Sequence, residues 1–126
     1  MTAAVTGLVP FVHVADVERS AAFYELLGLE VNDRFEPHGR LAWVWMEHGG
    51  ARVMLALAGE PVVPEQQAVL FYLYSHDLAG LREHLLASGV DAGEIVDGTP
   101  GPREEMRVVD PDGYTLMIAQ ITEETG

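Results

Sequence analysis

The sequence has no cysteine and no long apolar run, and each absence excludes a class of protein. None of the 126 residues is Cys, so neither a disulfide framework nor a thiolate metal site can form. No apolar stretch approaches the roughly 20 residues that a membrane-spanning helix requires. The N-terminus lacks the basic segment and the apolar segment of a signal peptide. We therefore expect a cytoplasmic protein with no membrane partner.

Basic residues are scarce. The chain has 7 Lys and Arg against 20 Asp and Glu, which gives a formal net charge of −13. Binding to a phosphate backbone needs clustered Lys and Arg, so no nucleic-acid partner is expected. A negative field raises the local concentration of cations and is compatible with a cationic small ligand. The same charge is also explained by a role in solubility alone, which is the commoner reason for such a balance.

The most informative feature that is present is an internal repeat. Asp16 recurs as Asp77, and Gly28 recurs as Gly89, both 61 residues later. Each pair brackets an amphipathic run that follows an apolar strand-like segment. Asp is a favoured helix N-cap, and Gly readily takes the left-handed conformation after a helix. The repeat predicts two equivalent modules and a cleft between them.

Turn residues and periodicity predict eight strands and two helices in the order βαβββ, βαβββ. The expected helices are Asp16 to Leu27 and Asp77 to Ala87. The expected strands are Leu8 to Val14, Leu29 to Phe35, Leu41 to Met46, Ala51 to Leu57, Ala68 to Tyr74, Ala92 to Val96, Arg103 to Val109 and Tyr114 to Gln120. The fold class is therefore α+β, with module one at about 5–58, a linker at 59–67 and module two at about 68–121 of a single domain, 1–126.

Four stretches carry a resemblance to a known family. They are Val14-Ala15-Asp16-Val17-Glu18-Arg19-Ser20, Phe23-Tyr24, Leu27-Gly28-Leu29 and Asp110-Pro111-Asp112-Gly113-Tyr114. In order and spacing the chain resembles the vicinal oxygen chelate superfamily, which includes glyoxalase I, extradiol dioxygenases and bleomycin resistance proteins. The resemblance covers almost the whole chain. It implies two βαβββ modules whose curved mixed sheets surround a shared cavity, and it implies a homodimer.

The same resemblance implies where a metal would be held in the enzymes of the family. Their His, Glu or Gln ligands fall here at or beside Val9, Leu55, Leu70 and Met117. None of these side chains is a donor suited to a divalent transition metal. We therefore expect no metal and no cofactor, and a protein of the metal-free bleomycin-resistance-like branch.

Strand alternation selects the candidate ligand-binding residues. His13 shares a strand face with Val9, and Tyr72 and Tyr74 share one with Leu70. Trp43, Trp45 and Glu47 share another face with Leu41, and with Leu55, Leu70 and Met117 they complete the expected site. Aromatic walls suit flat or cationic ligands, and Glu47 would add a negative charge. Alternatively, His13 is satisfied at the sheet edge, and the two indoles pack beneath a helix or in a dimer seam.

These features favour a binding protein that sequesters an aromatic or cationic small molecule. One alternative is an enzyme that acts without the usual metal, with His13 or a Tyr as general acid or base. Another is a non-catalytic protein-interaction module. The loop before Arg103-Glu104-Glu105 is rich in Pro and Gly, and it is either a lid over the cleft or a solvated loop.

Overall fold

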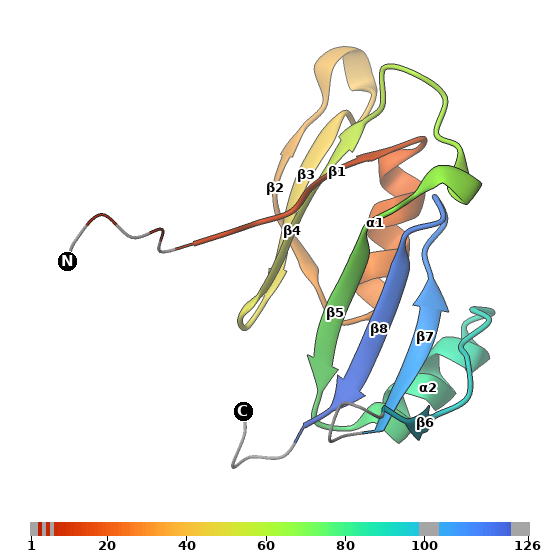
Figure 1. The fold of residues 1–126 in the computed structure, drawn as a ribbon. Coiled ribbons are helices and arrows are strands. Elements are labelled where there is room, and N and C mark those ends of the chain that lie inside the picture. Colours follow the sequence, from red (N-terminus) through yellow and green to blue (C-terminus); the bar gives the residue numbers. More distant parts are fainter. Residues whose placement is uncertain (1–2, 4, 6, 99–103, 122–126) are drawn as a thin grey trace. The chain divides into compact units, whose positions relative to one another are not determined.

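The structure is a computed structural model that describes residues 3, 5, 7–98 and 104–121 (Figure 1). Arg103, most of the preceding Pro- and Gly-rich loop and the tail from Thr122 lie outside the described residues. The chain forms two compact units, one ending at Val62 and the other beginning at Val63. Each unit contains one four-stranded mixed sheet and one α-helix. The predicted α+β class and the two βαβββ modules are confirmed.

The first unit contains a sheet with the strand order β1-β4-β3-β2. Strands β1 and β4 are parallel, and the other pairs are antiparallel. A 3₁₀ turn at Pro37–Gly39 precedes β3. The main elements are β1 (Phe11–Val14), α1 (Val17–Leu26), β2 (Glu30–Phe35), β3 (Trp43–His48) and β4 (Ala51–Leu57).

The second unit repeats this arrangement with the strand order β5-β8-β7-β6. Here β5 and β8 are parallel, as β1 and β4 are in the first unit. A 3₁₀ turn at Pro64–Gln66 precedes the sheet. The elements are β5 (Leu70–Ser75), α2 (Leu78–Ala87), β6 (Val96–Asp97), β7 (Glu104–Val109) and β8 (Thr115–Gln120).

The two helices begin and end as the repeat predicts. The Asp16 side chain accepts a hydrogen bond from the Arg19 backbone N–H, and the Asp77 side chain accepts one from Gly80. Gly28 and Gly89 follow the helices with φ of +96° and +86°, a region that favours glycine. Within the described residues, neither helix is long and apolar enough to cross a membrane.

Several expected strands differ from the observed ones at their ends. Strand β1 starts at Phe11 rather than Leu8, because Pro10 has no N–H to donate, although its carbonyl accepts from Met54. Strand β3 lies two residues later than expected, because only Gly49 and Gly50 separate it from β4. Leu41 therefore lies outside the strand.

Strand β6 is only two residues long and begins at Val96, whereas a strand from Ala92 was expected. Gly93 instead makes an isolated backbone hydrogen bond to the Arg107 carbonyl. The Arg82 guanidinium donates to the Gly93 carbonyl at 2.8 Å. These two bonds hold the segment before β6 without a continuous ladder.

Each sheet buries one of its faces. Alternate residues of β1, β3 and β4 are buried in the first unit, where α1 contacts β2, β3 and β4. In the second unit, alternate residues of β7 and β8 are buried, the small Ala119 is buried as well, and α2 contacts β8. The buried side chains are Val12, Val14, Val44, Met46, Val53 and Leu55 in the first sheet, and Met106, Val108, Leu116 and Ile118 in the second. The opposite face of each sheet is therefore available for other contacts.

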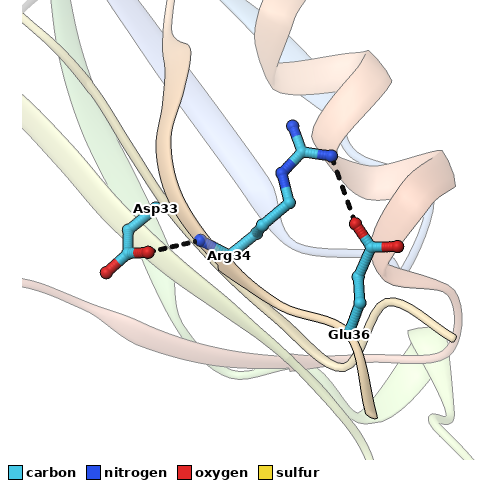
Figure 2. A network of polar contacts seen from close by, with 3 residues as sticks. All are labelled: Asp33, Arg34 and Glu36. Carbon is cyan, nitrogen blue, oxygen red and sulfur yellow. Dashed lines mark hydrogen bonds and ion pairs between the residues drawn. The ribbon is translucent and has the colours of Figure 1, made fainter. Parts of the chain in front are cut away.

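Strand β2 is an edge of the first sheet, and it carries charged side chains. The Asp33 carboxylate accepts from the Arg34 backbone N–H at 2.9 Å, and the Arg34 guanidinium reaches Glu36 at 3.3 Å (Figure 2). Charged side chains on an edge strand oppose pairing with another chain.

The Asp110-Pro111-Asp112-Gly113 segment forms the predicted turn between β7 and β8. Asp110 is buried, and its carboxylate accepts from the backbone N–H groups of Asp112 and Tyr114, each at 2.9 Å.

Burial and the nearby carboxylates raise the pKa of the Tyr114 hydroxyl, which therefore stays protonated. Gly113 has φ of +89°, and a Cβ there would lie 2.6 Å from Pro64 Cα.

We expect Gly113→Ala to destabilise the protein by about 2–4 kcal/mol, because it adds backbone strain and a clash with Pro64. Gly89→Ala is the matched control, since Gly89 has a similar φ of +86° and no atom within 4 Å of an added Cβ. The control should lose only about 1–2 kcal/mol. Urea unfolding of both variants tests this, and equal losses would contradict the role of the Pro64 contact.

Candidate functional site

The uncovered face of the first sheet is rich in aromatic side chains. Its ladder places Phe11, Met54 and Trp45 in one row, and His13, Ala56 and Trp43 in the next. We call these six residues and Glu47 the first open face. Phe11 is exposed, and its ring lies 5.3 Å from the His13 ring. Both indoles are half-buried. His13, Trp43 and Trp45 share this face of the sheet, and neither Trp lies on the helix-covered side. Their role in ligand binding stays a prediction.

Glu47 is held by its neighbours on this face. Its Oε1 accepts from the Trp45 indole N–H at 3.0 Å and from the Asn32 side-chain amide at 2.6 Å. Its Oε2 lies 3.6 Å from Arg52 Nε. Both carboxylate oxygens are therefore engaged, and the negative charge expected at Glu47 lies beside the cation of Arg52.

These contacts favour the ionised form of Glu47. The pKa of its carboxyl is lowered, first by the indole hydrogen bond and then by the Asn32 amide. Partial desolvation opposes this effect, and Arg52 adds a smaller lowering contribution. The carboxylate is thus a stable acceptor at neutral pH.

The uncovered face of the second sheet is more polar. Its rows are Leu70 with Thr115 and Val109, Tyr72 with Met117 and Arg107, and Tyr74 with Ala119 and Glu105. We call these nine residues the second open face. The Tyr72 and Tyr74 rings stack with centroids 5.5 Å apart, and Tyr72 donates its hydroxyl hydrogen bond to Glu105. Tyr72 is 52 % and Tyr74 60 % exposed, so both phenols are accessible.

The two open faces are built by equivalent strand pairings, but most of their side chains differ. In the first, Met54 lies between Phe11 and Trp45; in the second, Met117 lies between Tyr72 and Arg107. By the same correspondence Trp43 is replaced by Glu105. The positions of Trp45 and Trp43 in the first unit are thus occupied by Arg107 and Glu105 in the second.

Sequence reasoning missed Met54, Glu105 and Arg107 as members of these faces. Strand alternation sorts β4 and β7 into two sets of residues, but only the pairing with β1, β3 and β8 places these three side chains on the open faces. Leu55, by contrast, was expected in the ligand-binding site but does not lie on an open face. It is fully buried, pairs with Val12 and Val44, and lies on the helix-covered face. Its neighbour Met54 occupies the open face instead.

A family model now identifies the chain. The model of the Glyoxalase/Bleomycin resistance protein/Dioxygenase superfamily matches residues 7–118. The chain belongs to this superfamily. A search of the curated proteins finds no match to this chain.

Solved structures of the superfamily's fold are similar over nearly the whole chain. A bleomycin-binding protein complexed with bleomycin has 20% identity, a TM-score of 0.75 and coverage of 94% of this chain and 100% of its own. A bleomycin resistance determinant encoded on the transposon Tn5 has 23% identity, a TM-score of 0.68 and coverage of 92% and 98%. TnmS3, an antibiotic binding protein from Streptomyces sp. CB03234, has 20% identity, a TM-score of 0.72 and coverage of 97% and 100%. At these identities the likeness establishes the fold.

The metal positions implied by the superfamily hold no suitable donors here. Val9 precedes β1, Leu55 lies on the helix-covered face, and Leu70 and Met117 lie on the second open face. Across the part of the chain that the structure describes, no three His, Asp or Glu residues are grouped to hold a metal ion. These side chains do not fit a divalent metal.

The lowered pKa of Glu47 predicts a pH-dependent contribution to stability. Ionised Glu47 stabilises the fold above its usual pKa of 4.5, and this contribution is lost as the pH falls through the lower pKa of the folded state. We expect the unfolding free energy of the wild type to exceed that of Glu47→Gln at pH 7, with the difference shrinking below pH 4.5. Urea unfolding from pH 7 to 3 measures it.

Trp45→Phe is the control for this pH dependence, because it removes the largest cause of the lowered pKa. In that background the difference between Glu and Gln at position 47 should vary less with pH. A wild-type advantage that is constant from pH 7 to 3 would contradict the assignment.

Proposed function

We propose that this protein binds a small organic molecule, without a metal, and sequesters it. The observation that carries the proposal is the pair of uncovered sheet faces, on which aromatic side chains from different strands gather. Ligand sites combine apolar and aromatic walls with a few placed polar groups. Membership of a superfamily with a bleomycin-binding relative and an antibiotic-binding relative supports the same class of function.

The first open face suits a planar aromatic group. Trp43 and Trp45 lie on the same strand face, and Met54 lies beside Trp45 on the neighbouring strand. Indoles stack on flat rings, and the methionine thioether adapts to irregular apolar shapes. Stacking of this kind contributes roughly 0.5–1.5 kcal/mol for each aromatic pair beyond its burial.

The second open face suits a cationic group. The stacked Tyr72 and Tyr74 present two phenol rings, and the Glu105 carboxylate lies within reach of the Tyr72 hydroxyl. Aromatic faces attract cations by roughly 0.5–2 kcal/mol, depending on desolvation. Arg107 on the same face would accommodate an anionic substituent. A compound with a flat ring and an amine is the ligand class we favour.

A metal-free enzyme is the second candidate, and the Tyr72–Glu105 hydrogen bond is the observation that favours it. A tyrosine hydroxyl paired with a carboxylate can exchange a proton with a bound substrate. Sequestration predicts that a bound compound is recovered unchanged after incubation, whereas catalysis predicts a product.

Ligand titration tests the binding proposal. We expect some compounds in a panel of bleomycin-type glycopeptides and planar amines to quench tryptophan fluorescence, with affinity falling as salt rises because the charge of −13 is screened. Trp43→Ala or Tyr72→Ala should cost on the order of 1–3 kcal/mol of affinity. Leu86→Ala is the control, since Leu86 is an exposed residue of α2. Tight binding of neutral or anionic compounds alone would contradict the role of charge.

Elemental analysis tests the metal-free assignment. We expect no stoichiometric transition metal after purification without a His tag, because Val9, Leu55, Leu70 and Met117 offer no donor. We also expect neither glyoxalase I nor extradiol cleavage activity. Near one metal per chain that is lost in His13→Ala would overturn the assignment.

Light scattering tests a further proposal, that two copies of the chain form a homodimer. Large side chains on the uncovered faces are exposed, among them Phe11, Leu70, Tyr72 and Tyr74. Burying apolar surface contributes about 25 cal/mol per Å². We expect a mass of about twice 13.7 kDa at micromolar concentration, and a mass of one chain would count against the dimer.

A further inference from the structure

We propose that Glu47 is a positioning residue that fixes the indole of Trp45, with Asn32 as its second support, and that it does not attract cationic ligands. The inference rests on the proposed function, because it assigns how the first open face is prepared for a planar ring. It concerns one strand face of the first unit, and its main readout needs no ligand.

Residue spacing places the carboxylate beside the indole. Trp45 and Glu47 are two residues apart in β3, so their side chains emerge on the same face of the sheet. The Trp45 indole N–H donates to Glu47 Oε1 at 3.0 Å. A hydrogen bond to a charged acceptor is stronger than a neutral one and directional, so it restricts rotation of the ring.

A strand irregularity brings in the second donor. The pairing of β2 with β3 shifts between Val31 and Asp33, with Asn32 at the shift. A bulge changes the direction in which a side chain leaves the strand, so Asn32 need not alternate strictly with its neighbours between the two faces of the sheet. The Asn32 amide donates to the same Glu47 Oε1, at 2.6 Å. One oxygen thus receives both hydrogen bonds.

The remaining oxygen is paired with a cation of the chain itself. Arg52 Nε lies 3.6 Å from Glu47 Oε2, and the two residues face each other in the β3–β4 ladder. Their opposite charges largely cancel at a distance, so Glu47 adds little field for a cationic ligand. A cation recruited here would have to displace Arg52 or the Asn32 amide.

Trp43 provides an internal comparison. It lies on the same face, yet within the described residues no hydrogen bond of its indole is found. Among the described residues, Trp45 therefore has a hydrogen-bonded support that is not found for Trp43. Fixing a ring before binding reduces the conformational entropy that is lost when a ligand stacks on it.

Fluorescence of a single tryptophan tests the inference. The protein has two Trp residues, so Trp43→Phe leaves Trp45 as the only one. In that background, Glu47→Ala should lower the steady-state anisotropy and the near-UV circular dichroism of Trp45. Glu47→Gln should preserve both signals, because an amide oxygen can accept from Trp45 and Asn32 together. Arg52→Ala is the control and should leave both signals unchanged, since it removes only the ion pair.

A matched pair of tricyclic probes, neutral acridone and cationic proflavine, gives the functional readout. With wild-type Trp43, Glu47→Ala should weaken acridone binding about 3- to 10-fold, while Glu47→Gln stays within about twofold of the wild type. Equal Trp45 signals in wild type, Ala and Gln variants would overturn the inference. So would a loss of proflavine binding that is equally large in Glu47→Ala and Glu47→Gln, because charge alone would then explain it.

The same experiment separates this inference from the proposed function. Altered Trp45 signals in Glu47→Ala but not in Glu47→Gln support the positioning role whether or not a probe binds. If neither probe binds the wild type while those signals change as expected, the positioning role stands and the choice of a planar ligand fails.

Discussion

Each sheet of this protein buries one face and leaves the other uncovered, and the chemistry of the candidate site depends on this division. Burial of Val44 and Met46 in β3 fixes the side of the sheet on which Trp43, Trp45 and Glu47 must emerge, because successive residues of a strand point in opposite directions. A slip of one residue in the ladder would bury Glu47 without its partners and expose the core. Burial of the core residues therefore determines which side chains lie on the uncovered face of the sheet.

The internal repeat preserves this division while changing the side chains on the uncovered faces. Met54 and Met117 hold equivalent central positions, flanked by Trp45 in one unit and Arg107 in the other. The helix caps at Asp16 and Asp77 and the glycines that follow the helices are retained in both units. The capping positions and the central Met and Ala of the open faces are thus repeated, whereas the flanking positions on those faces differ.

Polar contacts on the two faces hold aromatic rings rather than leave charges free. Glu47 accepts from an indole in the first unit, and Glu105 accepts from the Tyr72 hydroxyl in the second. The indole N–H lies off the axis of its side chain, so its hydrogen bond restricts ring rotation, whereas the Tyr72 hydroxyl lies on the axis of its ring and only its position is restrained. On the first open face Arg52 also offsets the charge of Glu47, so that carboxylate adds little to the field of the net charge of −13.

The sequence by itself determined the α+β class, the βαβββ repeat, both helix caps and the shared face of Trp43, Trp45 and Glu47. These follow from local rules, since capping, turn chemistry and alternation each involve residues close in the chain. Only the tertiary structure decided that Leu55 lies on the buried face, that Asn32 turns onto Glu47, and that Arg107 and Glu105 take the places of the indoles. Such features depend on ladder register and on a bulge, which are set by pairing between strands and not by any one segment.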